Sequence, residues 1–260
     1  MATTGQTWAE REYTTALLVL TAATGAVDGV SYLALDRVFT GNMTGNVLFI
    51  GFGLMGVAGI PVLNNLVALL TFLLGAALGS RLTRRGAAAG VRLPRSSMGV
   101  LLGTTVGTLA LAGVWFGLGR LGTTEMIAVT GVLALLLGAQ ASAVKHIGIR
   151  DLSTVVVTMT MVNLAGDSRL AGGAGAAWFR RVGAIVTMGL GALGAAAVIR
   201  SLSGSWALVL AGVLMAAALG LLHRARRTDR RLAESTADSP GPDPSPLAPA
   251  HLRTSVPRKR

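Results

Sequence analysis

Long apolar stretches alternate with short polar ones along the first 222 residues. A helix of about 20 apolar residues crosses the roughly 30 Å of hydrocarbon in a bilayer. Six stretches approach or exceed that length and predict spanning helices at 14–35, 62–82, 98–118, 125–145, 181–200 and 204–222. The pattern therefore predicts an all-α integral membrane protein.

Two further segments, 38–58 and 152–166, are more polar and interrupted by helix-averse residues. Arginines cluster after the 62–82 helix and again after Leu222, and such clusters favour the cytoplasmic side. Both can be cytoplasmic only if 152–166 enters and leaves on one side, and the same treatment suits 38–58. We predict six spanning helices, two broken or partial ones and both termini in the cytoplasm. An eight-span arrangement stays open, because 38–58 would cross if tilted.

The chain divides into three parts. Residues 1–13 form a short cytoplasmic N-terminus, and residues 14–222 form one polytopic transmembrane domain. Residues 223–260 are basic and contain six of the eight prolines. Their low apolar content predicts a disordered cytoplasmic tail.

Composition supports the membrane assignment and excludes other classes. Charged residues make up 13% of the 260, against about 25% in soluble domains. The net charge of +12 lies in loops and tail, which predicts contact with anionic lipid headgroups and not with nucleic acid. Cysteine is absent and the three histidines are scattered, so we expect no metal and no cofactor. No nucleophile, metal or phosphate-binding motif indicates an enzyme. Arginine greatly outnumbers lysine, and alanine and glycine are abundant, a bias typical of GC-rich bacterial genes.

The first polar interruption, "FTGNMTGNVLFIG", follows an acid in the first helix. Gly41 and Gly45 disfavour helix there, and Asn42, Thr44 and Asn46 suit a cap. Broken backbone at membrane depth is tolerated when it lines a cavity or is buried in protein. Asp28 is costly in a membrane unless paired or hydrated, so it is a candidate for binding a solute or a coupling proton or Na⁺. Close packing of helices and a hydrogen-bonded structural Asp28 are the alternatives.

The second half repeats this layout. Gln140 precedes Thr158 by 18 residues, much as Asp28 precedes Thr44 by 16. Three crossings per half would turn the second copy (125–222) upside down relative to the first (14–118). A 3+3 inverted repeat is typical of secondary transporters, whose broken helices meet at the substrate. Candidate binding residues of the second copy are Gln140, Thr158, Thr160 and Asn163. Structural hydrogen bonds are the alternative for the threonines.

The stretch "GAVDGVSYL" running into "VFTGNMTGNVLFIG" resembles the signature of the YoaK family of uncharacterised bacterial membrane proteins. The resemblance covers about residues 14–222 and implies a multi-pass inner-membrane protein without an established activity. "GAQAS" in the second half fits the family pattern, whereas Met159 stands where that pattern has glycine.

Two functions follow from these observations. The first is a secondary transporter of a small solute, with Asp28, Asn42, Thr44 and Asn46 facing the second-copy residues across a cavity. The second is a non-transporting scaffold whose basic tail binds anionic lipid or a partner. The sequence specifies neither the solute nor an oligomeric state.

Overall fold

A computed structural model describes residues 4–84, 93–145, 147, 157–173, 175 and 177–237. Within these residues the chain is all-helical, as predicted, and forms no strand. The elements are α1 (Thr4–Ala34), α2 (Met43–Leu54), α3 (Val62–Arg84), α4 (Arg95–Leu118), α5 (Thr123–Lys145), α6 (Val157–Gly166), η1 (Arg169–Ala171), α7 (Trp178–Ser201) and α8 (Gly204–Ala237).

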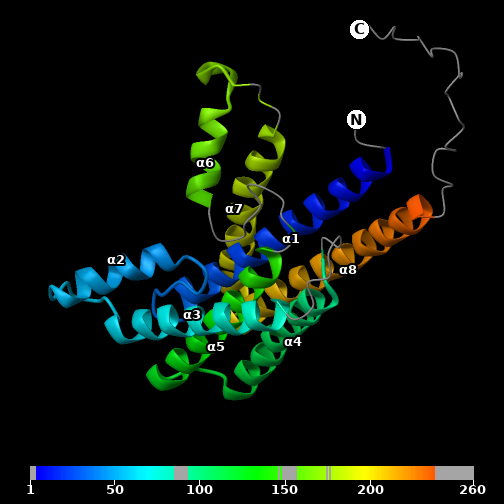
Figure 1. The fold of residues 1–260 in the computed structure, drawn as a ribbon. Helices are drawn as coiled ribbons and strands as arrows, with labels where there is room; N and C mark the ends of the chain where they lie inside the picture. Colours follow the sequence, from blue (N-terminus) through cyan, green and yellow to red (C-terminus); the bar gives the residue numbers. More distant parts are fainter. Residues whose placement is uncertain are drawn as a thin grey trace, which may run out of the picture.

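Six of the helices are long and apolar enough to cross a membrane, which confirms the predicted number: α1, α3, α4, α5, α7 and α8. The two interrupted segments form the short helices α2 and α6, which project from the bundle (Figure 1). The 12 residues of α2 rise about 18 Å. This is well short of the roughly 30 Å of hydrocarbon, so the eight-span alternative is not supported.

The outermost helices are longer than the sequence pattern indicates. α1 begins at Thr4 instead of residue 14, and α8 continues from the predicted end at residue 222 to Ala237. Packing explains the extension, because the Thr228 hydroxyl donates to Glu12 Oε2 at 3.1 Å and Ala225 is fully buried. Residues 223–237 are therefore helical, and the rest of the predicted disordered tail, 238–260, lies outside the described residues.

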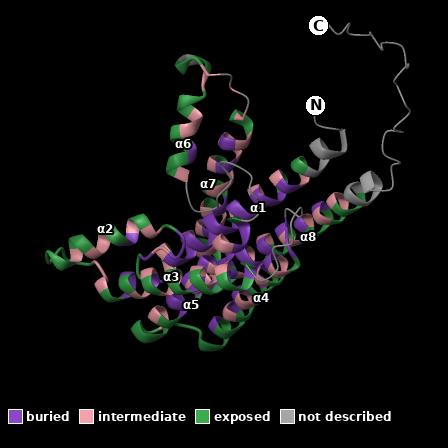
Figure 2. Ribbon diagram, viewed as in Figure 1, coloured by how far each residue is buried: buried purple, intermediate pink, exposed green. Residues whose placement is uncertain are grey.

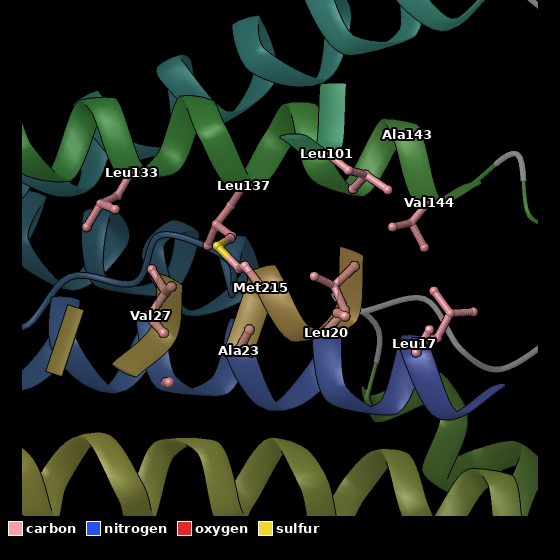
Figure 3. Packing of buried hydrophobic residues seen from close by; sticks show 14 of the residues in the cluster. Leu17, Leu20, Ala23, Val27, Leu101, Leu133, Leu137, Ala143, Val144 and Met215 are labelled. Carbon is pink, nitrogen blue, oxygen red and sulfur yellow. The ribbon is translucent and has the colours of Figure 1, made fainter. Parts of the chain in front are cut away.

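α1 and α5 are the two most buried spans and run antiparallel through the middle of the bundle. Figure 3 shows their apolar side chains facing each other, with Met215 of α8 between them. Figure 2 shows buried residues concentrated along α1, in the middle of the bundle. α3 and α7 lie at the periphery and leave apolar side chains such as Leu70 and Leu190 exposed. In a membrane these outer faces contact lipid.

α1 packs along α7 and α3 packs along α5, in each case through glycines. A methyl group at Gly25 would overlap the backbone of Met188, and one at Gly138 would overlap the backbone of Phe72. Such small residues let membrane helices approach closely. Residue numbers rise together along both pairs, so the helices of each pair are parallel.

The two pairs use the same register. Adding 113 to an α1 residue number gives its counterpart in α5, and adding 116 to an α3 residue number gives its counterpart in α7. With this numbering, contacts of the α1–α7 pair recur in the α3–α5 pair. The matched contacts are Leu18–Gly183 with Gly131–Val67, Ala22–Gly191 with Leu135–Gly75, Gly25–Met188 with Gly138–Phe72, and Gly29–Ala192 with Ser142–Ala76. One packing arrangement therefore occurs twice in the chain.

The helix ends separate the basic residues. The start of α1, the start of α7 and the end of α8 meet through the Glu10–Arg180 and Glu12–Thr228 contacts. Arg95 at the start of α4 is near Arg226 of α8, so it lies at this end too. The described cations at this end are Arg11, Arg81, Arg84, Arg95, Lys145, Arg180, Arg181, Arg224, Arg226, Arg227, Arg230 and Arg231; Arg37, Arg120 and Arg200 lie at the other, and Arg169 lies on η1 between α6 and α7.

Candidate functional site

The chain reverses direction between α1 and α2 in a short turn. Asp36 and Arg37 both adopt positive φ, at 68° and 58°, and both are exposed. Leu35 and Val38 on either side are fully buried. The turn therefore lies at the surface, and after it the chain re-enters the protein. Residues 39–42, the returning segment, lie beside α1.

Asp28 holds this returning segment in place. Its Oδ1 accepts hydrogen bonds from the backbone amides of Gly41 at 2.7 Å and Thr40 at 3.0 Å. The Thr40 hydroxyl donates to the same oxygen at 3.4 Å. A side chain at Gly41 would press against the carboxylate, so glycine permits this approach. Asp28 thus supplies partners for amides that the broken helix leaves unpaired.

The second carboxylate oxygen is different. Asp28 is only 6% exposed, yet its Oδ2 has no hydrogen-bond partner among the described residues. No salt bridge of the described chain involves Asp28. A buried polar atom without a partner is costly. Oδ2 is therefore an acceptor that requires a donor the described chain does not supply.

A pocket of about 450 Å³ lies beside this carboxylate, between α1, the returning segment and α7. Its polar contributors are Asp28, Tyr32 and Asn42, and the remainder of its wall is apolar. The full lining is Gly25, Asp28, Gly29, Tyr32, Leu33, Phe39, Asn42, Met188, Gly189, Ala192, Leu193 and Ala196. The volume falls in the range of small-molecule sites, about 300–1,000 Å³.

The three polar residues of the first break have different positions. α2 begins at Met43, and exposed Asn42 is its N-cap without a side-chain cap bond. Asn46 is fully buried and clamps Phe39, donating to its carbonyl at 2.6 Å and accepting from its amide at 3.0 Å. Thr44 is exposed. Asn42 lines the pocket, whereas Asn46 positions its wall.

Gln140 reaches across from α5 to α1. Its Nε2 donates to the Thr24 hydroxyl at 3.3 Å, and its Oε1 is buried without a partner in the described chain. Thr24 lies one turn before Asp28, so the two central helices share a line of buried polar groups. In the repeated register Gln140 matches Val27, and Asp28 matches Ala141. The second copy therefore has no carboxylate at the equivalent position.

The residues predicted in the second break lie on α6, which packs against α7 and η1. Thr158 is exposed, Thr160 is buried and Asn163 is half-buried. The Asn163 carbonyl accepts a hydrogen bond from the buried Arg181 at 2.8 Å, and Arg181 also pairs with Asp167 at 2.6 Å. A charged side chain thus anchors α6 to α7. Residues 148–156, which lead into α6, lie outside the described residues.

The structure does not bring the two sets of predicted residues together. α2 packs on α3 and α6 packs on α7, so these helices do not face each other across a cavity. Asp28 and Asn42 line the same pocket, whereas Gln140 bonds Thr24, one turn before Asp28. Sequence reasoning missed Thr24 and Thr40. Four-residue spacing from Asp28 pointed to Thr24, whereas nothing local pointed to Thr40.

Comparison with known proteins places the chain in context. The family model described as "Protein of unknown function (DUF1275)" matches residues 16–221. The UPF0700 transmembrane protein YoaK of Bacillus subtilis (strain 168) is 32% identical over 156 residues, which is 58% of this chain. The match spans 64% of that relative's length, just under two thirds. No solved structure matches the chain significantly.

Proposed function

The chain belongs to the DUF1275 family of uncharacterised membrane proteins, and we propose that it is a secondary transporter of a small solute with its site at Asp28. The observation that carries this proposal is the unpartnered Oδ2 of a buried carboxylate on the wall of a pocket. An ionisable group inside a membrane protein is retained for a reason other than hydrophobic stability. Asp28 would bind the solute directly or exchange it for a proton or Na⁺.

The repeated packing supports a transport mechanism. α1 and α5 run antiparallel, while each is parallel to its own partner, α7 or α3. These directions fit the inverted repeat that we infer, with α1–α4 as one copy and α5–α8 as the other. In inverted-repeat transporters, one repeat or one bundle of helices rocks against the other and opens the site alternately to each side. The pairs α1–α7 and α3–α5 each join one helix of each copy through close glycine contacts, so they would be the two bundles that move.

The distribution of cations supports one orientation. Most described arginines and Lys145 lie at the end that holds both termini of the described chain. By the positive-inside preference this end faces the cytoplasm of a bacterial inner (plasma) membrane. Anionic headgroups of the inner leaflet would contact its arginines. The Asp28 pocket is then nearer the outer face, because Asp28 lies close to the far end of α1.

Transient currents on solid-supported membranes test the proposal. Proteoliposomes of the full chain are exposed to primary amines, amino acids, sugars and carboxylates, in the presence and absence of proton and Na⁺ gradients. We expect currents for one class, abolished by Asp28→Asn. This change keeps a carbonyl oxygen for the Thr40 and Gly41 amides and places an NH₂ group at the Oδ2 position.

The matched control is Thr21→Val on the same helix. Thr21 is buried, and its hydroxyl bonds only the Leu17 carbonyl among the contacts described. Thr21→Val should transport like the unaltered protein. Equal currents in Asp28→Asn and the unaltered protein, or no current with any compound, would count against a transporter.

A non-transporting lipid-binding scaffold is the second candidate, favoured by the extension of α8. Arg224, Arg227, Arg230 and Arg231 are exposed on that extension. Replacing these four residues with glutamine should reduce the anionic lipid that co-purifies with the protein. If the protein is a scaffold, the four-glutamine variant loses lipid and Asp28→Asn behaves like the unaltered protein. If the protein is a transporter, Asp28→Asn abolishes the current and the four-glutamine variant keeps it.

A further inference from the structure

The polar groups around Asp28 determine which kind of head group the pocket accepts. The Gly41 and Thr40 amides at the start of the broken segment already bond Oδ1. They are therefore not available to an anion, although unpaired amides before a helix ordinarily attract one. No lysine or arginine lines the pocket. The polar atom left without a partner is an acceptor, the buried Oδ2 of Asp28.

The walls determine the body of the ligand. Apart from Asp28, Asn42 and the Tyr32 hydroxyl, they are formed by glycines, apolar side chains and the rings of Tyr32 and Phe39. The Tyr32 and Phe39 rings stack with centroids 4.9 Å apart and planes inclined by 20°. Asn46 fixes Phe39 through both of its backbone groups. The aromatic wall is thus held in place before any ligand binds.

The mouth of the pocket lies on the outer surface of the bundle. Leu33 and Leu193, which line it, are 53% and 65% exposed. α7 is the least buried of the six spans, so its outer face contacts lipid. A ligand therefore reaches the carboxylate past apolar side chains that contact the bilayer.

From these three features we infer that the pocket binds an amphiphilic amine, with a protonated nitrogen at Asp28 Oδ2 and an apolar or aromatic body between α1 and α7. An ammonium group supplies the missing donor and neutralises a buried charge. A carboxylate or phosphate ligand would be repelled. The aromatic wall adds cation–π attraction to the nitrogen. This inference names the solute class for the transporter proposed above and rests on that proposal for transport, but not for binding.

Calorimetry with three matched probes tests it. 2-Phenylethylammonium, 2-phenylethanol and 3-phenylpropionate present a cationic, a neutral and an anionic head on similar bodies. Each is titrated into the full chain in phosphatidylcholine nanodiscs, with empty nanodiscs as the blank. We expect the ammonium to bind at least about tenfold more tightly than the alcohol, which corresponds to one charge-assisted hydrogen bond. 3-Phenylpropionate should not bind detectably.

Two variants assign the binding to the pocket. Asp28→Asn should weaken 2-phenylethylammonium binding by about tenfold or more, because an NH₂ group would face the ammonium. Leu193→Trp should weaken all binding by narrowing the mouth, and Thr21→Val should change nothing. Thermal unfolding of each variant confirms that it is folded.

The outcomes separate binding from transport. Tighter binding of 3-phenylpropionate, or full retention of ammonium binding in Asp28→Asn, would overturn the inference. Asp28-dependent currents with sugars or carboxylates, in a protein that does not bind 2-phenylethylammonium, would contradict the amine inference. They would still support a transporter, of another solute class. Binding of 2-phenylethylammonium without any current would support the binding site and contradict the transporter proposal.

Discussion

The junctions α1–α2 and α5–α6 occupy matching places in the two halves but are stabilised by different chemistry. Gly25 and Gly138 sit at the same register position, each against a backbone of the partner helix. Three residues later the first half has Asp28, whereas the second has Ala141. The second junction relies instead on the buried Arg181 of α7, bound to Asp167 and to the Asn163 carbonyl. The packing frame is duplicated and the carboxylate site is not.

The starts of α3 and α7 differ in the same way. Asn64 and Asn65 of α3 match Arg180 and Arg181 of α7 in the repeated register. Both members of the α3 pair are buried, and the Asn64 side chain donates to the Leu35 carbonyl at 3.3 Å. α3 starts at the end with few cations and α7 at the end with many. Equivalent polar positions therefore carry amides on one side and arginines on the other, as the positive-inside preference favours.

The strongest test of the duplicated frame is a methyl group at each central glycine. Gly25→Ala and Gly138→Ala should each lower the free energy of unfolding by about 3 kcal/mol, because the methyl overlaps the backbone of Met188 or Phe72. Thermal and SDS unfolding in detergent measure the loss. Gly189→Ala, which meets no atom within 4 Å, is the control and should not destabilise. A loss at only one of the two glycines would break the equivalence of the halves.

Removal of the carboxylate should have the next largest effect. Asp28→Ala leaves the buried amides of Thr40 and Gly41 without an acceptor and should cost about 2 kcal/mol. Asp28→Asn keeps the acceptor and should cost much less. Hydrogen exchange of the residue 40 and 41 amides provides the readout. Equal protection of those amides in the alanine and asparagine variants would contradict the structural role of Oδ1.

The second junction should be somewhat less sensitive. Arg181→Met removes two charge-assisted hydrogen bonds, but Asp167 is 58% exposed and can return to water. We expect a loss of about 1.5 kcal/mol in unfolding free energy. Arg180→Met is the control, since its 3.5 Å pair with Glu10 is partly exposed and should contribute almost nothing. A greater loss of unfolding free energy in Arg180→Met than in Arg181→Met would show that Arg181 is not the residue that anchors α6 to α7.

The smallest effect is expected where the halves meet. The 3.3 Å bond from Gln140 to Thr24 is long, and Gln140 Oε1 is buried without a described partner. Thr24→Val and Gln140→Leu should each change the unfolding free energy by less than about 1 kcal/mol. The double variant should be less destabilised than the sum, because replacing both polar partners leaves neither unsatisfied. Additive losses in the double-mutant cycle would show that the two side chains do not interact.

Much of the architecture follows from the apolar pattern. Each spanning helix must pair its backbone groups internally, and its side chains must be apolar whether they contact lipid or other helices. The six spans were therefore predictable from length and hydropathy. Asp28 stood out because an acid is rare among such neighbours. The extension of α8 was not predictable, since residues 223–237 are polar and the contact of this stretch with α1, Thr228 with Glu12, joins residues 216 apart. Nor was the Thr40 contact, which joins residues twelve apart through a turn with two left-handed residues.

The membrane environment, the six apolar spans, the broken segments and the acid beside the first of them could be inferred from the amino-acid sequence alone, because they depend on local composition and on the cost of polar backbone in hydrocarbon. The folded structure was needed to show that Asn46 holds Phe39 and that Gln140 contacts Thr24 and not a second break. It was also needed to show that Asp28 Oδ1 is hydrogen-bonded while the buried Oδ2 has no partner among the described residues. Those outcomes depend on which helix faces approach each other, and approach distances are set by glycines whose partners lie on other helices.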